Sequence, residues 1–233
     1  YLTYPANAPV QDRFAEGLLQ TLLEMGPQVL ARPDDVEVRA NIMWTATMAL
    51  NGLIGVGVPQ DWATHGIGHG LTALFGLDHA QTLAIVLPGI LQIRREAKRG
   101  KLLQYAERVW GLKNGTEDER IDAAIGHTRA FFEQMGVPTR LSGYGLGAEA
   151  IDATVAAMEA AGLTGLGEQL PHDGQGAAVV GDRSGEAEGL TGALVRGDSV
   201  TADPLDQSGG RGDPLRRVDQ LVLALGVRLD LAR

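Results

Sequence analysis

The chain has 233 residues, with 29 acidic and 20 basic side chains and a formal net charge of −9 at pH 7. This acidic balance argues against a surface for nucleic acid or for an anionic membrane, so we expect neither partner. The absence of cysteine excludes disulfides, thiolate metal sites and cysteine nucleophiles, and it fits a reducing, cytoplasmic location.

The first half of the chain predicts three helices. Proline residues 9 and 27 bracket an apolar stripe at helical spacing, which predicts a helix that they bound. The stripe consists of Phe14, Leu18, Leu19, Leu22 and Leu23. Pro33-Asp-Asp35 opens a second helix that continues beyond Met48, and a histidine-bearing helix follows Pro59-Gln-Asp61.

Three further helices are predicted after residue 100. The first shows one apolar face, made of Leu102, Tyr105, Ala106 and Val109. Thr116-Glu-Asp-Glu119 is a capping box and predicts the start of a longer helix. The apolar face of this helix consists of Ile121, Ala124, Ile125, Thr128, Phe131 and Met135. A shorter helix is expected over 148–161. Because no strand ladder is recognisable, we predict an all-α helical bundle.

Two other features of this region are interpreted structurally. The apolar runs over 49–58 and 83–93 are too short or too interrupted to span a bilayer, so we expect no membrane insertion. A basic cluster is interpreted as a solvated helix face, with a phosphate site as the alternative. The cluster consists of Arg94, Arg95, Lys98, Arg99 and Lys101.

Three of the five histidines lie in one short stretch, at positions 65, 69 and 79. The i, i+4 spacing places His65 and His69 on one face of a helix. Gly76 and Asp78 indicate a turn, after which His79 can fold back onto that face. Because neutral imidazole binds zinc and iron(II) well, the cluster is a candidate metal site. The alternative is a set of core or surface histidines with ordinary hydrogen-bond partners.

Glycine at positions 66, 68 and 70 supports a special role for the histidine helix. Each glycine costs a helix interior roughly 1 kcal/mol relative to alanine, so it needs a packing or ligand-approach reason. We therefore expect another group to approach this helix closely.

Six stretches of the chain match the pattern of a known family: 39–44, 49–55, 57–65, 76–88, 101–110 and 131–138. They resemble the iron-containing alcohol dehydrogenases, and most of all their NADPH-dependent butanol dehydrogenase or aldehyde reductase branch. The resemblance runs from Tyr1 to about Gly167. It implies that residues 1–168 form the family's helical, dehydroquinate synthase-like metal-binding domain.

The resemblance also implies roles for individual residues. Family members hold a divalent metal, iron(II) or zinc, with an Asp-x3-His pair and two histidines fourteen positions apart, which His65 and His79 match. His69 matches the histidine beside nicotinamide and substrate, which implies catalytic and cofactor-binding roles. Trp62 and Phe75 are candidates for the walls of the substrate pocket. The implied reaction is hydride transfer between an alcohol or aldehyde and NADP(H) or NAD(H), with the metal as Lewis acid.

The resemblance further implies parts that this chain lacks. In relatives the Asp-x3-His pair and the nucleotide-binding domain precede the position of Tyr1, so we expect both to be absent here. Two histidines alone would bind a metal more weakly than four ligands. Full-length members are expected to be homodimers.

Residues 169–233 depart from the family. No aromatic residue follows Tyr144 and no lysine follows Lys113. We interpret 169–233 as a low-complexity tail, either disordered or the out-of-frame translation of a GC-rich gene.

The leading hypothesis for function is a metal-dependent NAD(P)H alcohol dehydrogenase or aldehyde reductase, present as its C-terminal fragment. The alternative is a non-enzymatic remnant or an interaction protein with a helical-bundle fold. A self-contained hydrolytic metalloenzyme would need further ligands, for which Asp61 and Asp78 are the nearby acids.

Overall fold

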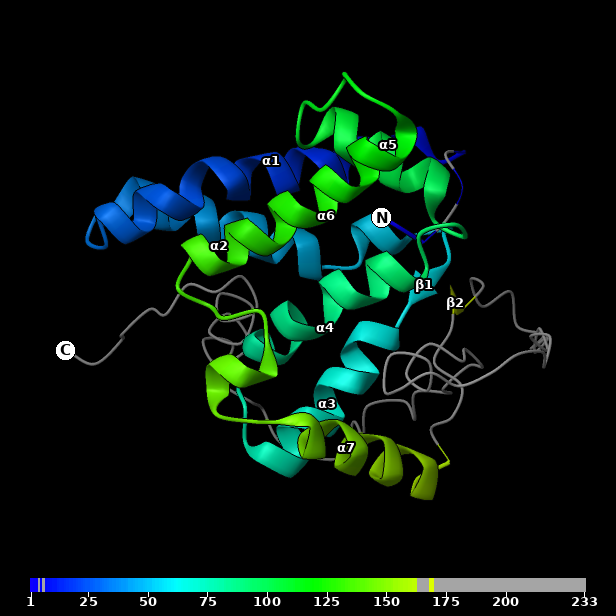
Figure 1. The fold of residues 1–233 in the computed structure, drawn as a ribbon. Helices are drawn as coiled ribbons and strands as arrows, with labels where there is room; N and C mark the ends of the chain where they lie inside the picture. Colours follow the sequence, from blue (N-terminus) through cyan, green and yellow to red (C-terminus); the bar gives the residue numbers. More distant parts are fainter. Residues whose placement is uncertain (4, 6, 163–167, 170–233) are drawn as a thin grey trace.

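The computed structural model describes residues 1–3, 5, 7–162 and 168–169. Within these residues the chain forms seven α-helices, two short 3-10 turns and one pair of two-residue strands (Figure 1). The prediction of an all-α fold is confirmed. Apart from Gln169, the tail predicted over 169–233 lies outside the described residues.

Helices α1 (Pro9–Ala31) and α2 (Val36–Leu50) form an antiparallel pair along one side of the molecule (Figure 1). The start of α2 follows the sequence prediction. The Asp35 carboxylate accepts hydrogen bonds from the backbone N–H groups of Glu37 and Val38, at 3.1 and 3.2 Å. This is the capping that a free helix N-terminus requires.

The predicted end of α1 at Pro27 is wrong, because the helix continues through this residue. A proline in a helix interior costs about 3 kcal/mol. Leu22 and Val29, on either side of Pro27, are both buried against Val38 and Ile42 of α2. Burying an aliphatic side chain contributes about 1.5 to 3 kcal/mol, so the two together offset the proline.

Helices α3 (Ala63–Phe75) and α4 (His79–Ile93) form the second pair. The sequence pattern does not predict α4, since its apolar residues run almost without interruption and Pro88 breaks them. The structure explains that composition, because α4 lies at the centre of the bundle and contacts both α3 and α6. Buried on several sides, it has no polar face from which a helical period can be read.

Three helices complete the bundle: α5 (Arg99–Arg108), α6 (Glu117–Gln134) and α7 (Ala148–Ala160). The capping box at the start of α6 is confirmed. The Thr116 N–H donates to Glu119 Oε2 at 2.8 Å, and the Glu119 N–H donates to Thr116 Oγ1 at 3.2 Å. Two 3-10 turns, η1 (Leu53–Gly55) and η2 (Leu141–Tyr144), lie in the connections.

One short strand ladder corrects the expectation of none. Strand β1 (Gln60–Asp61) pairs antiparallel with β2 (Glu168–Gln169), with Asp61 opposite Glu168. Two residues are too few to show the alternation that predicts a strand, and the partner lies more than a hundred residues later. The ladder places residues 168–169 beside the start of α3.

The apolar core consists of linked clusters. The cluster between α3, α4 and α7 contains Ala63, Ile67, Leu71, Val86, Ile90 and Met158. The cluster between α4, α5 and α6 contains Leu91, Leu102, Ile121 and Ile125. Helix α4 contributes to both clusters, so it joins the two sides of the molecule (Figure 1). In the described part of the chain, none of the helices has the length and apolar character needed to cross a bilayer.

The basic cluster between α4 and α5 is only partly a solvated face. Lys98 and Lys101 are each 4% exposed, so that interpretation is wrong for them. Their ammonium groups pair with the carboxylates of Asp61 and Asp12, respectively. A buried ammonium needs such a partner, because its desolvation would otherwise be very costly.

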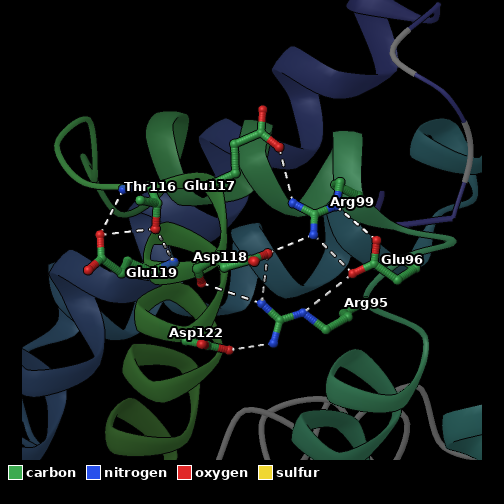
Figure 2. Close-up of polar contacts among 8 residues, drawn as sticks. All are labelled: Arg95, Glu96, Arg99, Thr116, Glu117, Asp118, Glu119 and Asp122. Carbon is green, nitrogen blue, oxygen red and sulfur yellow. Dashed lines mark hydrogen bonds and ion pairs between the residues drawn. The ribbon is translucent and has the colours of Figure 1, made fainter.

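Two arginines of the cluster, Arg95 and Arg99, form an ion-pair network at the surface, which Figure 2 shows. Arg99 pairs with Glu117 at 3.1 Å and with Asp118 at 2.6 Å, and Arg95 pairs with Asp122 at 2.8 Å. The network ties the α4–α5 turn to the first turns of α6. These carboxylates also lie near the N-terminus of α6, where the helix dipole favours negative charge.

Helices α3 and α4 approach each other closely at Gly68. A Cβ atom at this position would lie 2.8 Å from Thr82 Oγ1. The Thr82 side chain cannot move away easily, since it is fully buried and its hydroxyl donates to the His79 carbonyl at 2.7 Å. The expected close approach to the histidine helix is therefore confirmed at Gly68.

We predict that Gly68→Ala destabilises the chain by about 1 to 2 kcal/mol, because overpacking outweighs the gain in helix propensity. The control is Gly126→Ala in α6, where an added Cβ meets nothing within 4 Å. That variant is expected to gain about 0.5 to 1 kcal/mol. Urea unfolding measures both, and a Gly68 variant as stable as the Gly126 variant would contradict the close contact.

Candidate metal centre

The structure brings the three clustered histidine rings together. His65 and His69 lie one turn apart on α3, and His79 is the first residue of α4. The ring centroid of His79 lies 5.2 Å from that of His65 and 5.0 Å from that of His69. The rings of His65 and His69 are 6.4 Å apart. His79 is therefore the member that both other rings approach.

The turn between α3 and α4 is what brings His79 to this position. Gly76 ends α3 with φ 67°, a left-handed conformation that glycine adopts without strain. Asp78 then caps α4 in a capping box, and its N–H donates to Gln81 Oε1 at 3.0 Å. The predicted fold-back of His79 through Gly76 and Asp78 is confirmed.

The ring separations can be compared with those around a metal ion. Two imidazoles that bind one ion through nitrogen at about 2.1 Å, at near-tetrahedral angles, have centroids roughly 5 Å apart. The separations of His79 from His65 and from His69 fit this value, whereas the 6.4 Å between His65 and His69 does not. In the part of the chain that the structure describes, no three histidine, cysteine or acidic side chains are placed to hold one ion. The residues present thus fit two ligands of a metal.

The electrostatic environment keeps the His65 ring neutral. Burial, together with the neighbouring His79 and His69, lowers the pKa of His65 to about 4, although Asp61 pulls it the other way. Burial, and then His69, also lowers the pKa of His79. Neutral imidazole is the form that binds a metal, so these two rings are available as ligands at pH 7.

The two candidate pocket residues, Trp62 and Phe75, lie at opposite ends of α3. Trp62 immediately precedes α3, is 41% exposed, and its ring lies edge-on to His65 with the centroids 5.5 Å apart. Phe75 is at the other end of α3 and packs against the apolar cluster shared with α4 and α7. Trp62 therefore borders the histidine cluster, whereas Phe75 contributes to the core.

Both nearby acids are engaged in local structure. Asp61 accepts hydrogen bonds from Lys98 Nζ at 2.8 Å and from the Ala63 N–H at 2.9 Å. Burial raises the pKa of Asp61, but the charge and hydrogen bond of Lys98 outweigh it and leave the pKa below its usual value. Asp78 serves as the cap of α4. Neither acid completes a hydrolytic metal site with the histidines.

Comparison with known proteins identifies the family. The family model for the C-terminal part of the Fe-containing alcohol dehydrogenases matches residues 1–173. The chain belongs to this family.

Two proteins of similar sequence are named as an aldehyde reductase and a probable butanol dehydrogenase. The chain is 62% identical over 173 residues to the NADPH-dependent aldehyde reductase YqhD of Escherichia coli, covering 74% of this chain and 44% of that protein. It is 35% identical over 154 residues to the probable NADH-dependent butanol dehydrogenase 1 of Bacillus subtilis, covering 65% of this chain and 40% of that protein. The chain thus spans less than half the length of either relative.

Similar folds are found among solved structures. The substrate- and cofactor-free form of Escherichia coli YqhD matches with a TM-score of 0.72 and 54% identity, over 84% of this chain and 48% of that one. The NADH-dependent butanol dehydrogenase A of Thermotoga maritima matches with a TM-score of 0.62 and 32% identity, over 65% of this chain and 38% of that one. The helical architecture is therefore that of the family.

We predict that the His65 ring of the metal-free chain titrates near pH 4. Because the folded-state pKa lies below the ordinary 6.5, the contribution of this group to stability is complete above pH 6.5. It decreases as the pH falls from 6.5 towards 4. Ring proton–carbon NMR spectra measure the titration, with His65→Gln for assignment. A midpoint near 6.5 would contradict the burial described above.

Proposed function

We propose that this chain is the metal-binding part of a metal-dependent, NAD(P)H-linked alcohol dehydrogenase or aldehyde reductase. The reaction is the interconversion of primary alcohols and aldehydes by hydride transfer. The observation that carries the proposal is the 5.2 Å separation of the His65 and His79 rings in a chain of this family. The nucleotide-binding part and the further metal ligands would come from protein outside this chain.

His65 and His79 are the proposed metal ligands. Each projects from the first turn of its helix, so helix packing holds both rings. The lowered pKa values of these rings favour the neutral, metal-binding form. When bound, the divalent ion, iron(II) or zinc, supplies Lewis-acid polarisation of a substrate oxygen.

His69 is the proposed catalytic helper and nicotinamide contact. His69 is exposed, whereas His65 is half-buried. The ring centroid of His69 lies 5.0 Å from that of His79. An exposed imidazole in that position can accept or donate a proton at its ring nitrogen while it contacts a bound cofactor. Trp62 would border the substrate near His65, and Phe75 would support the pocket from the core.

The cofactor would be NADP(H) or NAD(H), since the similar aldehyde reductase is named NADPH-dependent and the similar butanol dehydrogenase NADH-dependent. A cytoplasmic location agrees with the absence of cysteine. The homodimeric state expected of full-length members stays a prediction.

A chimaera tests the proposed function. Residues 1–162 of this chain replace the matching region of Escherichia coli YqhD, to which the chain is 62% identical over 173 residues. We expect the purified chimaera to oxidise NADPH when an aldehyde is added. His65→Ala within it should remove that activity, because the metal loses a ligand, whereas His127→Ala on α6 should leave it intact.

The outcome separates the two functional hypotheses. A chimaera that folds and binds NADPH but reduces no aldehyde would contradict the enzymatic role. That result would favour the non-enzymatic remnant or interaction protein. Activity that survives His65→Ala would instead overturn the assignment of the metal ligand.

A further inference from the structure

The buried ion pair between Lys98 and Asp61 lies at the start of the histidine helix. The two side chains are only 2% and 14% exposed, and Lys98 Nζ donates to Asp61 Oδ2 at 2.8 Å. Lys98 Nζ also donates to the Leu2 carbonyl at 3.2 Å. A lysine buried in this way needs its partners, because an ammonium group without them would bear the full cost of desolvation.

Asp61 connects this pair to α3. Its second carboxylate oxygen, Oδ1, accepts the N–H of Ala63, the first residue of the helix, at 2.9 Å. Trp62, at the N-cap position, provides no side-chain cap of its own. Asp61 therefore supplies the acceptor that the first turn needs, and its negative charge favours the helix N-terminus. His65 is the third residue of that turn.

Lys98 connects the pair to α4 and α5. Its backbone N–H donates to the Arg94 carbonyl at 2.9 Å, at the end of α4, and its carbonyl accepts the Leu102 N–H of α5 at 2.8 Å. The ammonium position is thus fixed by the junction of two helices. One continuous chain of hydrogen bonds joins this junction, through Asp61, to the turn that carries His65.

We propose that Lys98 and Asp61 are positioning residues that fix the first turn of α3, and with it the His65 ring, against α4. As far as His65 is a metal ligand, this inference rests on the proposed function. Neither residue is a proposed metal ligand, because Lys98 acts through Asp61 and Asp61 acts through the backbone of α3. Removing a group that hydrogen-bonds directly to a metal ligand typically changes metal affinity 10- to 100-fold, and for a pair that acts through the backbone we expect the lower end, about tenfold.

A second buried pair provides a matched control. Lys101 lies one turn after Lys98, is equally buried at 4% exposure, and pairs with Asp12 of α1. Replacing either lysine by methionine leaves one carboxylate without its lysine in the interior. Among the contacts of the described residues, Lys98 connects to α3 through Asp61, whereas Lys101 connects to α1 through Asp12. On these contacts, general destabilisation should affect both variants, whereas loss of positioning should affect Lys98→Met alone.

The primary readout is the set of histidine ring resonances in the metal-free, full-length chain. The five histidines give ring proton–carbon signals that single His→Gln variants assign. The His127 ring on α6, whose centroid lies 5.3 Å from that of Trp110, is an internal reference. We expect Lys98→Met and Asp61→Asn to shift the His65 signal and leave that of His127. Lys101→Met should leave His65 in place.

Asp61→Asn keeps the inference testable if Lys98→Met does not fold. Its amide oxygen can still accept from the Ala63 N–H, so only the ion pair is lost.

A chemical rescue adds a readout that a merely structural role would not move. Since the chain has no cysteine, Lys98→Cys can be aminoethylated while unfolded, which restores an ammonium group at this position alone. We expect the His65 signal to return to its wild-type position.

Titration calorimetry with zinc then measures whether the position of the His65 ring affects metal affinity. We expect about tenfold weaker zinc binding in Lys98→Met than in Lys101→Met. An unchanged His65 signal in Lys98→Met and Asp61→Asn, or an equal shift in Lys101→Met, would overturn the inference. A wild-type chain that binds no zinc would instead overturn the proposed function, and the ring signals would still decide the positioning role.

Discussion

The close contact between α3 and α4 at Gly68 is the constraint on which the rest of the structure depends. Because position 68 has no side chain, the buried Thr82 can pack directly on α3 while its hydroxyl holds the His79 carbonyl. That contact sets the separation of the His65 and His79 rings. It also places α4 at the centre of the bundle, where it joins the cluster around α7 to the cluster around α6.

The sequence predicts the features of this fold whose causes are local. The Asp35 cap and the Thr116 capping box depend on partners within three residues, and both are present. Proline also acts locally, but Pro27 stays inside α1 because side chains on both sides of it are buried against another helix. The burial of Lys98 and Lys101 could not be predicted, since their carboxylate partners lie 37 and 89 residues away in the sequence.

The same distinction applies to the candidate site. The His65–His69 spacing and the Gly76–Asp78 turn are local, so the convergence of three rings could be expected from sequence. The involvement of Asp61 could not, because its role depends on Lys98 from a later helix junction. The site also offers two suitably spaced rings, with the nearby acids already engaged. These two rings, His65 and His79, are the proposed half-site, in a chain that spans less than half the length of its relatives.

X-ray absorption at the zinc edge of the zinc-loaded chain identifies the atoms that bind the metal. We predict two imidazole nitrogens at about 2.0 to 2.1 Å, with oxygen completing the shell, and loss of both nitrogens in the His65→Ala, His79→Ala double variant. A shell of oxygen alone in the wild-type chain, or a spectrum that the double variant leaves unchanged, would contradict a metal half-site at the crossing of α3 and α4.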